Sequence, residues 1–81
     1  MKLSVFLFAA LREGAGRDSI VVELPQACTV ADLRQRIAEA LPTLASLLSR
    51  SALAVNHQYA DETQILNERD EIAVIPPVSG G

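Results

Sequence analysis

The C-terminal end of the chain carries the group whose chemistry the sequence points to most clearly. Residues 75–81 read IPPVSGG, so two residues without side chains stand last. Because glycine has no Cβ, Gly80 and Gly81 can thread a channel too narrow for other residues. The reactive group at the tip is the α-carboxylate of Gly81, which is inert until it is activated, for instance by adenylation. The alternative interpretation is a frayed terminus without a role.

The residues before the glycines predict a tail that reaches away from a folded domain. Pro76 and Pro77 end a preceding strand, because proline lacks the ladder donor, and they hold the backbone extended. Val78 and Ser79 continue the spacer. Fully extended, the segment IPPVSGG spans roughly 20 Å. We therefore expect a tail that delivers its terminal carboxylate to another protein.

Outside the tail, the sequence shows no set of residues that would form an active site. Its one histidine, His57, follows Asn56 in a predicted turn, and its one cysteine, Cys28, precedes a predicted helix cap. We interpret both as structural, although Cys28 could act as a nucleophile if a base approached it. The acidic pairs at residues 61–62 and 70–71 read as solvated turn charges, because neighbours on a strand point to opposite faces. No glycine-rich phosphate motif occurs. We expect no bound cofactor or metal and no catalysis by this chain alone.

Composition limits the partners and the location. The 81 residues, 49% of them hydrophobic, fit one globular domain, and the single cysteine excludes a disulfide scaffold. The net charge is −3 and no basic stripe is present, so nucleic acid is a poor partner. The apolar run at residues 3–11 is short for a signal peptide and too short to span a membrane. We expect a cytoplasmic protein that does not bind membranes.

Hydrophobic periodicity predicts an α+β domain over residues 1–76, followed by a flexible tail over residues 77–81. Thr29 is a good N-cap, and Asp32 completes a variant of the capping box at the start of the clearest helix. Mixed strands and one main helix favour a mixed sheet with that helix packed across one face. The predicted elements are strands at 2–8, 19–24, 52–55, 58–60 and 71–75, helices at 28–41 and 43–50, and a turn at 9–16.

Four segments carry a family resemblance that covers essentially the whole chain. They are FAALREGAG, TVADLRQRIAE, AVNHQYA and, most specifically, DEIAVIPPVSGG. Together they resemble ubiquitin-like β-grasp proteins, in particular the small, sulfur-carrying subunits of molybdopterin synthases. Two turns depart from that pattern: His57 stands where the family often has Gly, and Glu68-Arg69 stand where it often has Asp-Gly.

The resemblance implies a cycle of sulfur transfer. An ATP-dependent, ubiquitin-activating-like adenylyltransferase adenylates the Gly81 carboxylate, and a sulfur donor system converts the acyl adenylate to a thiocarboxylate. The tail then enters the large catalytic subunit of the synthase, in a heterotetramer. There it donates sulfur to cyclic pyranopterin monophosphate to form the dithiolene of molybdopterin, in molybdenum cofactor biosynthesis. ATP is used by the activating enzyme, not bound by this chain.

An apolar patch is predicted for partner docking. If the alternation of the first strand turns Leu7 toward the helix, Phe8 faces outward, and in the last strand Ile75 does the same. With Tyr59 nearby, these residues form a patch beside the tail. The resemblance implies partner contact at the same three positions.

Three other interpretations stay open on the sequence. The chain could carry sulfur for thiamine or cysteine biosynthesis, with the same tail chemistry and a different acceptor. It could instead be conjugated to lysines of target proteins, as ubiquitin is. It could also be a passive binding module with an inert tail. Arg12 and Glu13 match a segment of the resemblance, but the sequence assigns them no role.

Overall fold

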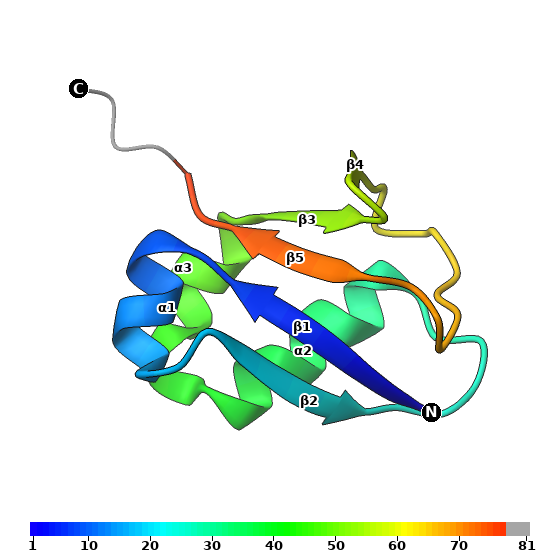
Figure 1. The fold of residues 1–81 in the computed structure, drawn as a ribbon, viewed down its shortest axis with the longest axis horizontal. Helices are drawn as coiled ribbons and strands as arrows, with labels where there is room; N and C mark the ends of the chain where they lie inside the picture. Colours follow the sequence, from blue (N-terminus) through cyan, green and yellow to red (C-terminus); the bar gives the residue numbers. More distant parts are fainter. Residues whose placement is uncertain (78–81) are drawn as a thin grey trace.

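The computed structural model describes residues 1–77, and it is built on a five-stranded sheet in the order β2-β1-β5-β3-β4 (Figure 1). Strands β1 and β5 run parallel, and the other neighbouring strands run antiparallel. The predicted mixed sheet of an α+β domain is therefore confirmed. The elements in chain order are β1 (Lys2–Leu7), α1 (Ala9–Ala15), β2 (Ser19–Glu23), α2 (Val30–Ala40), the 3-10 helix η1 (Pro42–Leu44), α3 (Ala45–Ser49), β3 (Ala52–Val55), β4 (Gln58–Tyr59) and β5 (Ile72–Ile75).

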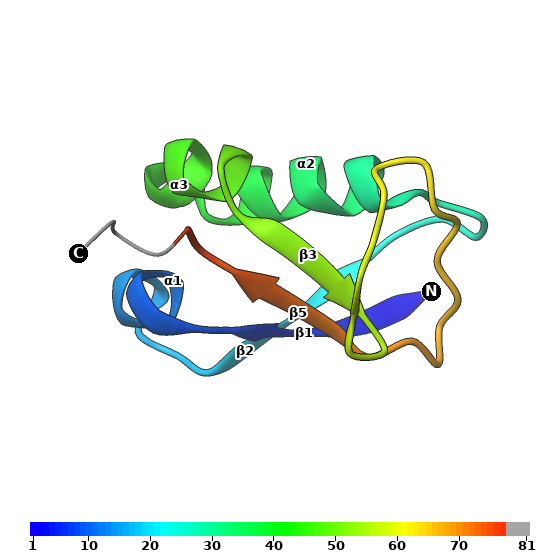
Figure 2. The same ribbon diagram turned by 90° about the horizontal axis from the view of Figure 1, so that it is seen from above.

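The core lies between the sheet and the helices α2 and α3, which cover one of its faces (Figure 2). Residues of β1 alternate between exposed and buried, as predicted for a strand with one face on the core. Helix α2 buries Val30, Leu33 and Ile37, which lie on one side of the helix at the predicted spacing. Burial of this apolar area is the main driving force for folding. The opposite face of the sheet carries no helix among the described residues.

Helix α2 begins at the predicted cap. The Thr29 side chain accepts a hydrogen bond from the Asp32 N–H at 3.2 Å, and the Thr29 N–H donates to Asp32 Oδ2 at 2.9 Å. Two further N–H groups of the first turn, those of Val30 and Ala31, donate to carbonyl oxygens of the loop at residues 61–66. The otherwise unpaired N–H groups of the helix start are thus satisfied by one cap and one distant loop.

One predicted element is wrong: residues 9–16 do not form a simple turn, because most of them form helix α1. The segment AALREGA contains strong helix formers, and the fully buried Leu11 anchors it to the core. Gly16 closes the helix in the left-handed conformation, with φ of 72°, and its N–H donates to the Arg12 carbonyl. Gly14 lies inside the helix, where a Cβ would approach Leu44 Cδ2 to 2.6 Å. Helix α1 therefore stands between β1 and β2, which pair as predicted but without a tight hairpin turn.

The remaining boundaries agree with the sequence to within a few residues. Strand β3 has the predicted limits, and Asn56 and His57 form the predicted tight turn, with φ of 52° and 70°. The region predicted as a short second helix splits into η1 and α3. None of the helices found in residues 1–77 has the length and apolar character needed to cross a membrane.

Candidate functional site

The tail leaves the fold from the middle of the sheet. Strand β5 lies between β1 and β3 and ends at Ile75. Pro76 follows half-buried, and Pro77 is exposed. Helix α1 lies beside this end of β5 (Figure 1). The predicted tail residues Val78, Ser79, Gly80 and Gly81 lie outside the described residues, so the structure establishes only the place where the tail begins.

The open face of the sheet has a hollow beside this exit. Cross-strand register places Phe6 opposite Ala73, Ala73 opposite Ala54, and Ala54 opposite Tyr59. Two large aromatic residues therefore flank two alanines across four strands. A hollow of about 310 Å³ lies over the two alanines, and its apolar lining consists of Phe8, Ala54, Tyr59, Ala73 and Ile75.

The structure brings together the three residues predicted from the sequence to contact a partner. Phe8, Tyr59 and Ile75 all line the hollow, although they come from the residue between β1 and α1, from β4 and from β5. Phe8 is 45% exposed and Tyr59 is 77% exposed, values that are high for aromatic side chains without a partner. The alternation from Ile75 could have identified Ala73. Ala54 could not have been identified, because its place depends on the register of β3.

Two polar residues, His57 and Glu71, line the hollow and form what we call its rim. His57 Nε2 lies 3.0 Å from Glu71 Oε2, and both side chains line the hollow. Asn56 fixes the turn beneath them: its Oδ1 accepts the Glu71 N–H, and its Nδ2 donates to Asp70 Oδ1, both at 2.9 Å. The side chains of His57 and Glu71 are exposed to solvent, as predicted for turn positions, and they also lie beside the predicted contact residues.

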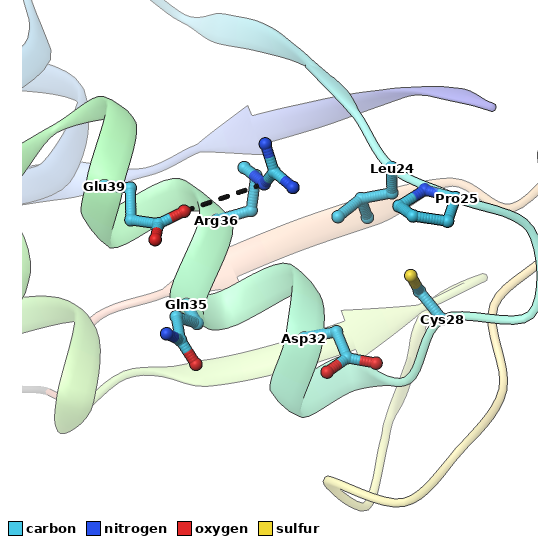
Figure 3. A pocket seen from close by; sticks show the side chains of 7 residues that line it. All are labelled: Leu24, Pro25, Cys28, Asp32, Gln35, Arg36 and Glu39. Carbon is cyan, nitrogen blue, oxygen red and sulfur yellow. Dashed lines mark ion pairs between the residues drawn. The ribbon is translucent and has the colours of Figure 1, made fainter.

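A second pocket, between the end of β2 and α2, contains the cysteine (Figure 3). The sulfur of Cys28 points toward Leu24 and Pro25, and the half-buried side chain packs against the core. The carboxylate nearest the helix start belongs to Asp32, and the hydrogen bond from the Thr29 backbone N–H lowers its pKa. A histidine could serve as the base that activates a cysteine. The one histidine of the chain, His57, lines the hollow on the sheet and not this pocket. Cys28 thus packs against the core, in agreement with its structural interpretation from the sequence.

The described residues hold no group of three or more His, Cys, Asp and Glu side chains that could bind a metal. What the arrangement offers is a largely apolar hollow on the open face of the sheet, next to the place where residues 76–77 leave β5. A mixed sheet of order β2-β1-β5-β3-β4, with α2 crossing one face, defines the ubiquitin-like β-grasp class. The small archaeal modifier protein 1 of Haloferax volcanii superimposes with a TM-score of 0.87 over 100% of both chains, at 28% identity.

The chain belongs to the ThiS family, whose profile matches residues 5–81. It is similar to the molybdopterin synthase sulfur carrier subunit of Dictyostelium discoideum, at 41% identity over 99% of this chain and 96% of the relative. It is also similar to a chain in the complex of subunits 1 and 2 of molybdopterin-converting factor from Helicobacter pylori. That match has a TM-score of 0.70, with 26% identity over 100% of both chains. The resemblance noted in the sequence is therefore confirmed.

Proposed function

We propose that this chain is the sulfur carrier subunit of molybdopterin synthase and acts in molybdenum cofactor biosynthesis. The observation that carries the proposal is the full-length match to curated sulfur carrier subunits of this kind. The family profile extends through Gly81 and so includes the Gly-Gly end. The β-grasp domain then binds the partner enzymes, and the segment at residues 77–81 carries the reactive carboxylate.

The chemistry takes place at the α-carboxylate of Gly81. An adenylyltransferase joins this carboxylate to AMP from ATP and releases pyrophosphate. A sulfur donor then displaces AMP and leaves a thiocarboxylate. In the synthase the thiocarboxylate gives its sulfur to the pterin, and water restores the carboxylate. Tethering the sulfur to a docked protein raises its effective concentration at the acceptor.

Docking to the large subunit is proposed for the hollow and its aromatic walls, with contacts from Phe8, Tyr59 and Ile75. The Helicobacter pylori relative was solved as a complex of two subunits, which supports a partner of this kind. Ile75 lines the hollow and directly precedes Pro76, so a partner seated there lies where the tail begins. The narrow Gly80 and Gly81 would then enter the partner's active site.

We also propose a cytoplasmic location. The apolar run at residues 3–11 resembles a leader only in composition, because Leu3, Val5, Leu7 and Leu11 are all buried in the core. Removing this segment would remove the interior strand β1 and the anchor of α1.

The test is the intact mass of the purified chain after incubation with an activating enzyme, ATP and a sulfur source. The expected result is a gain equal to the replacement of one oxygen by sulfur, mapped to Gly81. The loaded chain, mixed with the large subunit and cyclic pyranopterin monophosphate, should then yield molybdopterin. Absence of the mass gain, with an enzyme shown to load a related carrier in parallel, would contradict the proposal.

Protein conjugation is the second candidate, because a structural neighbour is named a small archaeal modifier protein. The same acyl adenylate would then react with a lysine amine of a target instead of a sulfur donor. The product would be an isopeptide bond between Gly81 and the target. A digest of the reaction mixture that shows Gly81 on lysine side chains, with no thiocarboxylate, would favour this candidate.

A further inference from the structure

We infer that the hollow receives one apolar side chain of the large subunit, and that a basic residue flanks this side chain on the partner and pairs with Glu71. The inference rests on the proposed function and makes it more specific, because it states the chemistry of the partner's docking segment. It also assigns a role in specificity to Ala54, Ala73 and Glu71.

The cross-strand register gives the hollow a floor of small apolar residues. Ala73 and Ala54 lie side by side on β5 and β3, and their small side chains form the floor of the hollow. Phe8 and Tyr59 are much larger, and both line the hollow. A floor of small residues between large ones leaves room for a side chain from outside. Pockets of this kind bind the anchor residues that contribute most of the energy of protein interfaces.

The size of the floor residues is therefore the feature that selects the anchor. Ala73 is half-buried, and Ala54 is 7% exposed, although both lie on the face of the sheet without a helix. A larger residue at position 73 would project outward into the hollow rather than into the core. Its effect should consequently be much larger on docking than on folding.

The rim of the hollow carries the carboxylate of Glu71. Glu71 is half-exposed, and only its Oε2 approaches His57, so the carboxylate can accept another hydrogen bond. A proton on His57 Nε2 makes that contact a hydrogen bond, which orients the carboxylate. Asp70, the preceding residue, does not line the hollow, and its carboxylate accepts hydrogen bonds from Asn56 Nδ2 and the Asn67 N–H. A lysine or arginine is the group that complements this end of the hollow.

Calorimetric titration of the large subunit from the same organism tests both parts. Ala73→Leu should fill the floor and raise the Kd at least about tenfold. Glu71→Gln should raise the Kd about threefold at low salt and reduce the dependence of the Kd on salt. The matched controls are Val21→Leu and Glu23→Gln, which alter exposed residues of β2 on the same face but outside the hollow. Both controls should bind within about twofold of the unaltered chain.

The outcomes are distinguishable. Failure of the unaltered chain to bind the large subunit would overturn the proposed function and this inference together. Normal binding by the unaltered chain and by Ala73→Leu would overturn the inference alone. An unchanged salt dependence for Glu71→Gln would overturn the assignment of a basic residue. Self-association that Ala73→Leu abolishes would assign the hollow to a second copy of the chain. If Ala73→Leu fails to fold, Ala73→Val, with a smaller side chain that favours strands, replaces it in the same titration.

Discussion

The guanidinium of Arg34 donates two hydrogen bonds to the carboxylate of Glu62. Its Nε donates to Oε1 at 2.8 Å, and one of its two terminal nitrogens donates to Oε2 at 3.1 Å. Its other terminal nitrogen donates to the carbonyl oxygens of Leu48 and Ser51, each at 2.6 Å. One side chain of α2 therefore ties the end of α3 to the loop that satisfies the start of α2. From the sequence Glu62 is interpreted only as a solvated turn charge, because no local pattern indicates a pair between residues 28 positions apart.

Replacement of Arg34 by alanine should destabilise the domain. The change leaves carbonyl groups at the end of α3 without their donor and frees the loop at residues 61–66. We expect a loss of about 2 kcal/mol in the free energy of unfolding, measured by urea denaturation. The matched control is Arg36→Ala on the same helix, whose exposed pair with Glu39 spans 3.7 Å. That control should lose no more than about 0.5 kcal/mol. Equal losses in the two variants would contradict the tying role of Arg34.

Asp32→Asn should remove a part of the stability that depends on pH. Hydrogen bonds from Thr29 lower the pKa of Asp32 from its ordinary value of 3.8, so the fold favours the ionised carboxylate. This contribution is present above pH 3.8 and is lost as the pH falls through the lower pKa of the folded state. The unaltered chain should melt at a higher temperature than Asp32→Asn near neutral pH, and the difference should shrink in acid. Glu39→Gln, which removes the same charge from α2, is the control. A difference that does not vary with pH would contradict the assignment.

His57→Gly should stabilise the domain slightly. His57 has a φ of 70°, which glycine adopts without steric cost. The pair with Glu71 is largely exposed and contributes little. Because glycine also adds entropy to the unfolded chain, we expect a net gain of about 0.5 kcal/mol. The control is Gln58→Gly, one residue later in β4, which should lower stability. A loss of stability in His57→Gly would show that its side chain outweighs the backbone strain.

Phe8→Ala and Ile75→Ala should weaken binding to the large subunit more than they lower stability. Both side chains line the hollow, and Phe8 is largely outside the core. We expect the Kd to rise about tenfold for each, with a smaller change in the free energy of unfolding. Val21→Ala, which removes an apolar group from the same face of β2, should leave the Kd unchanged. Unaltered affinity in Phe8→Ala and Ile75→Ala would remove the proposed docking face.

Deletion of Gly81 should abolish activation without unfolding the domain. All of the buried apolar residues found in the described part of the chain lie between Leu3 and Val74. The melting temperature should therefore change by less than about 1 °C, while the mass gain on sulfur loading disappears. Addition of one alanine after Gly81 keeps both glycines but moves the carboxylate, and it should abolish loading equally. Loading of either variant would contradict the role of the Gly81 carboxylate.

The sequence by itself determined the elements whose signals are local. The Thr29 cap is contained in a few neighbouring residues, and so is the apolar spacing of α2. The alternation of β1 likewise identifies its buried face and turns Phe8 outward. The tail motif needs no fold at all to be recognised, because its chemistry depends on residue types and order.

Only the tertiary structure decided the features that depend on register or on distant partners. Residues 9–16 contain glycines that predict a turn, but burial of Leu11 against the core stabilises a helix there. The hollow depends on Ala54 and Ala73 lying opposite each other, and nothing in a single strand specifies its register with another. The Arg34–Glu62 pair and the Glu71 rim arise in the same way. Short-range patterns predict secondary structure, whereas contacts between residues far apart in the sequence exist only once the chain has folded.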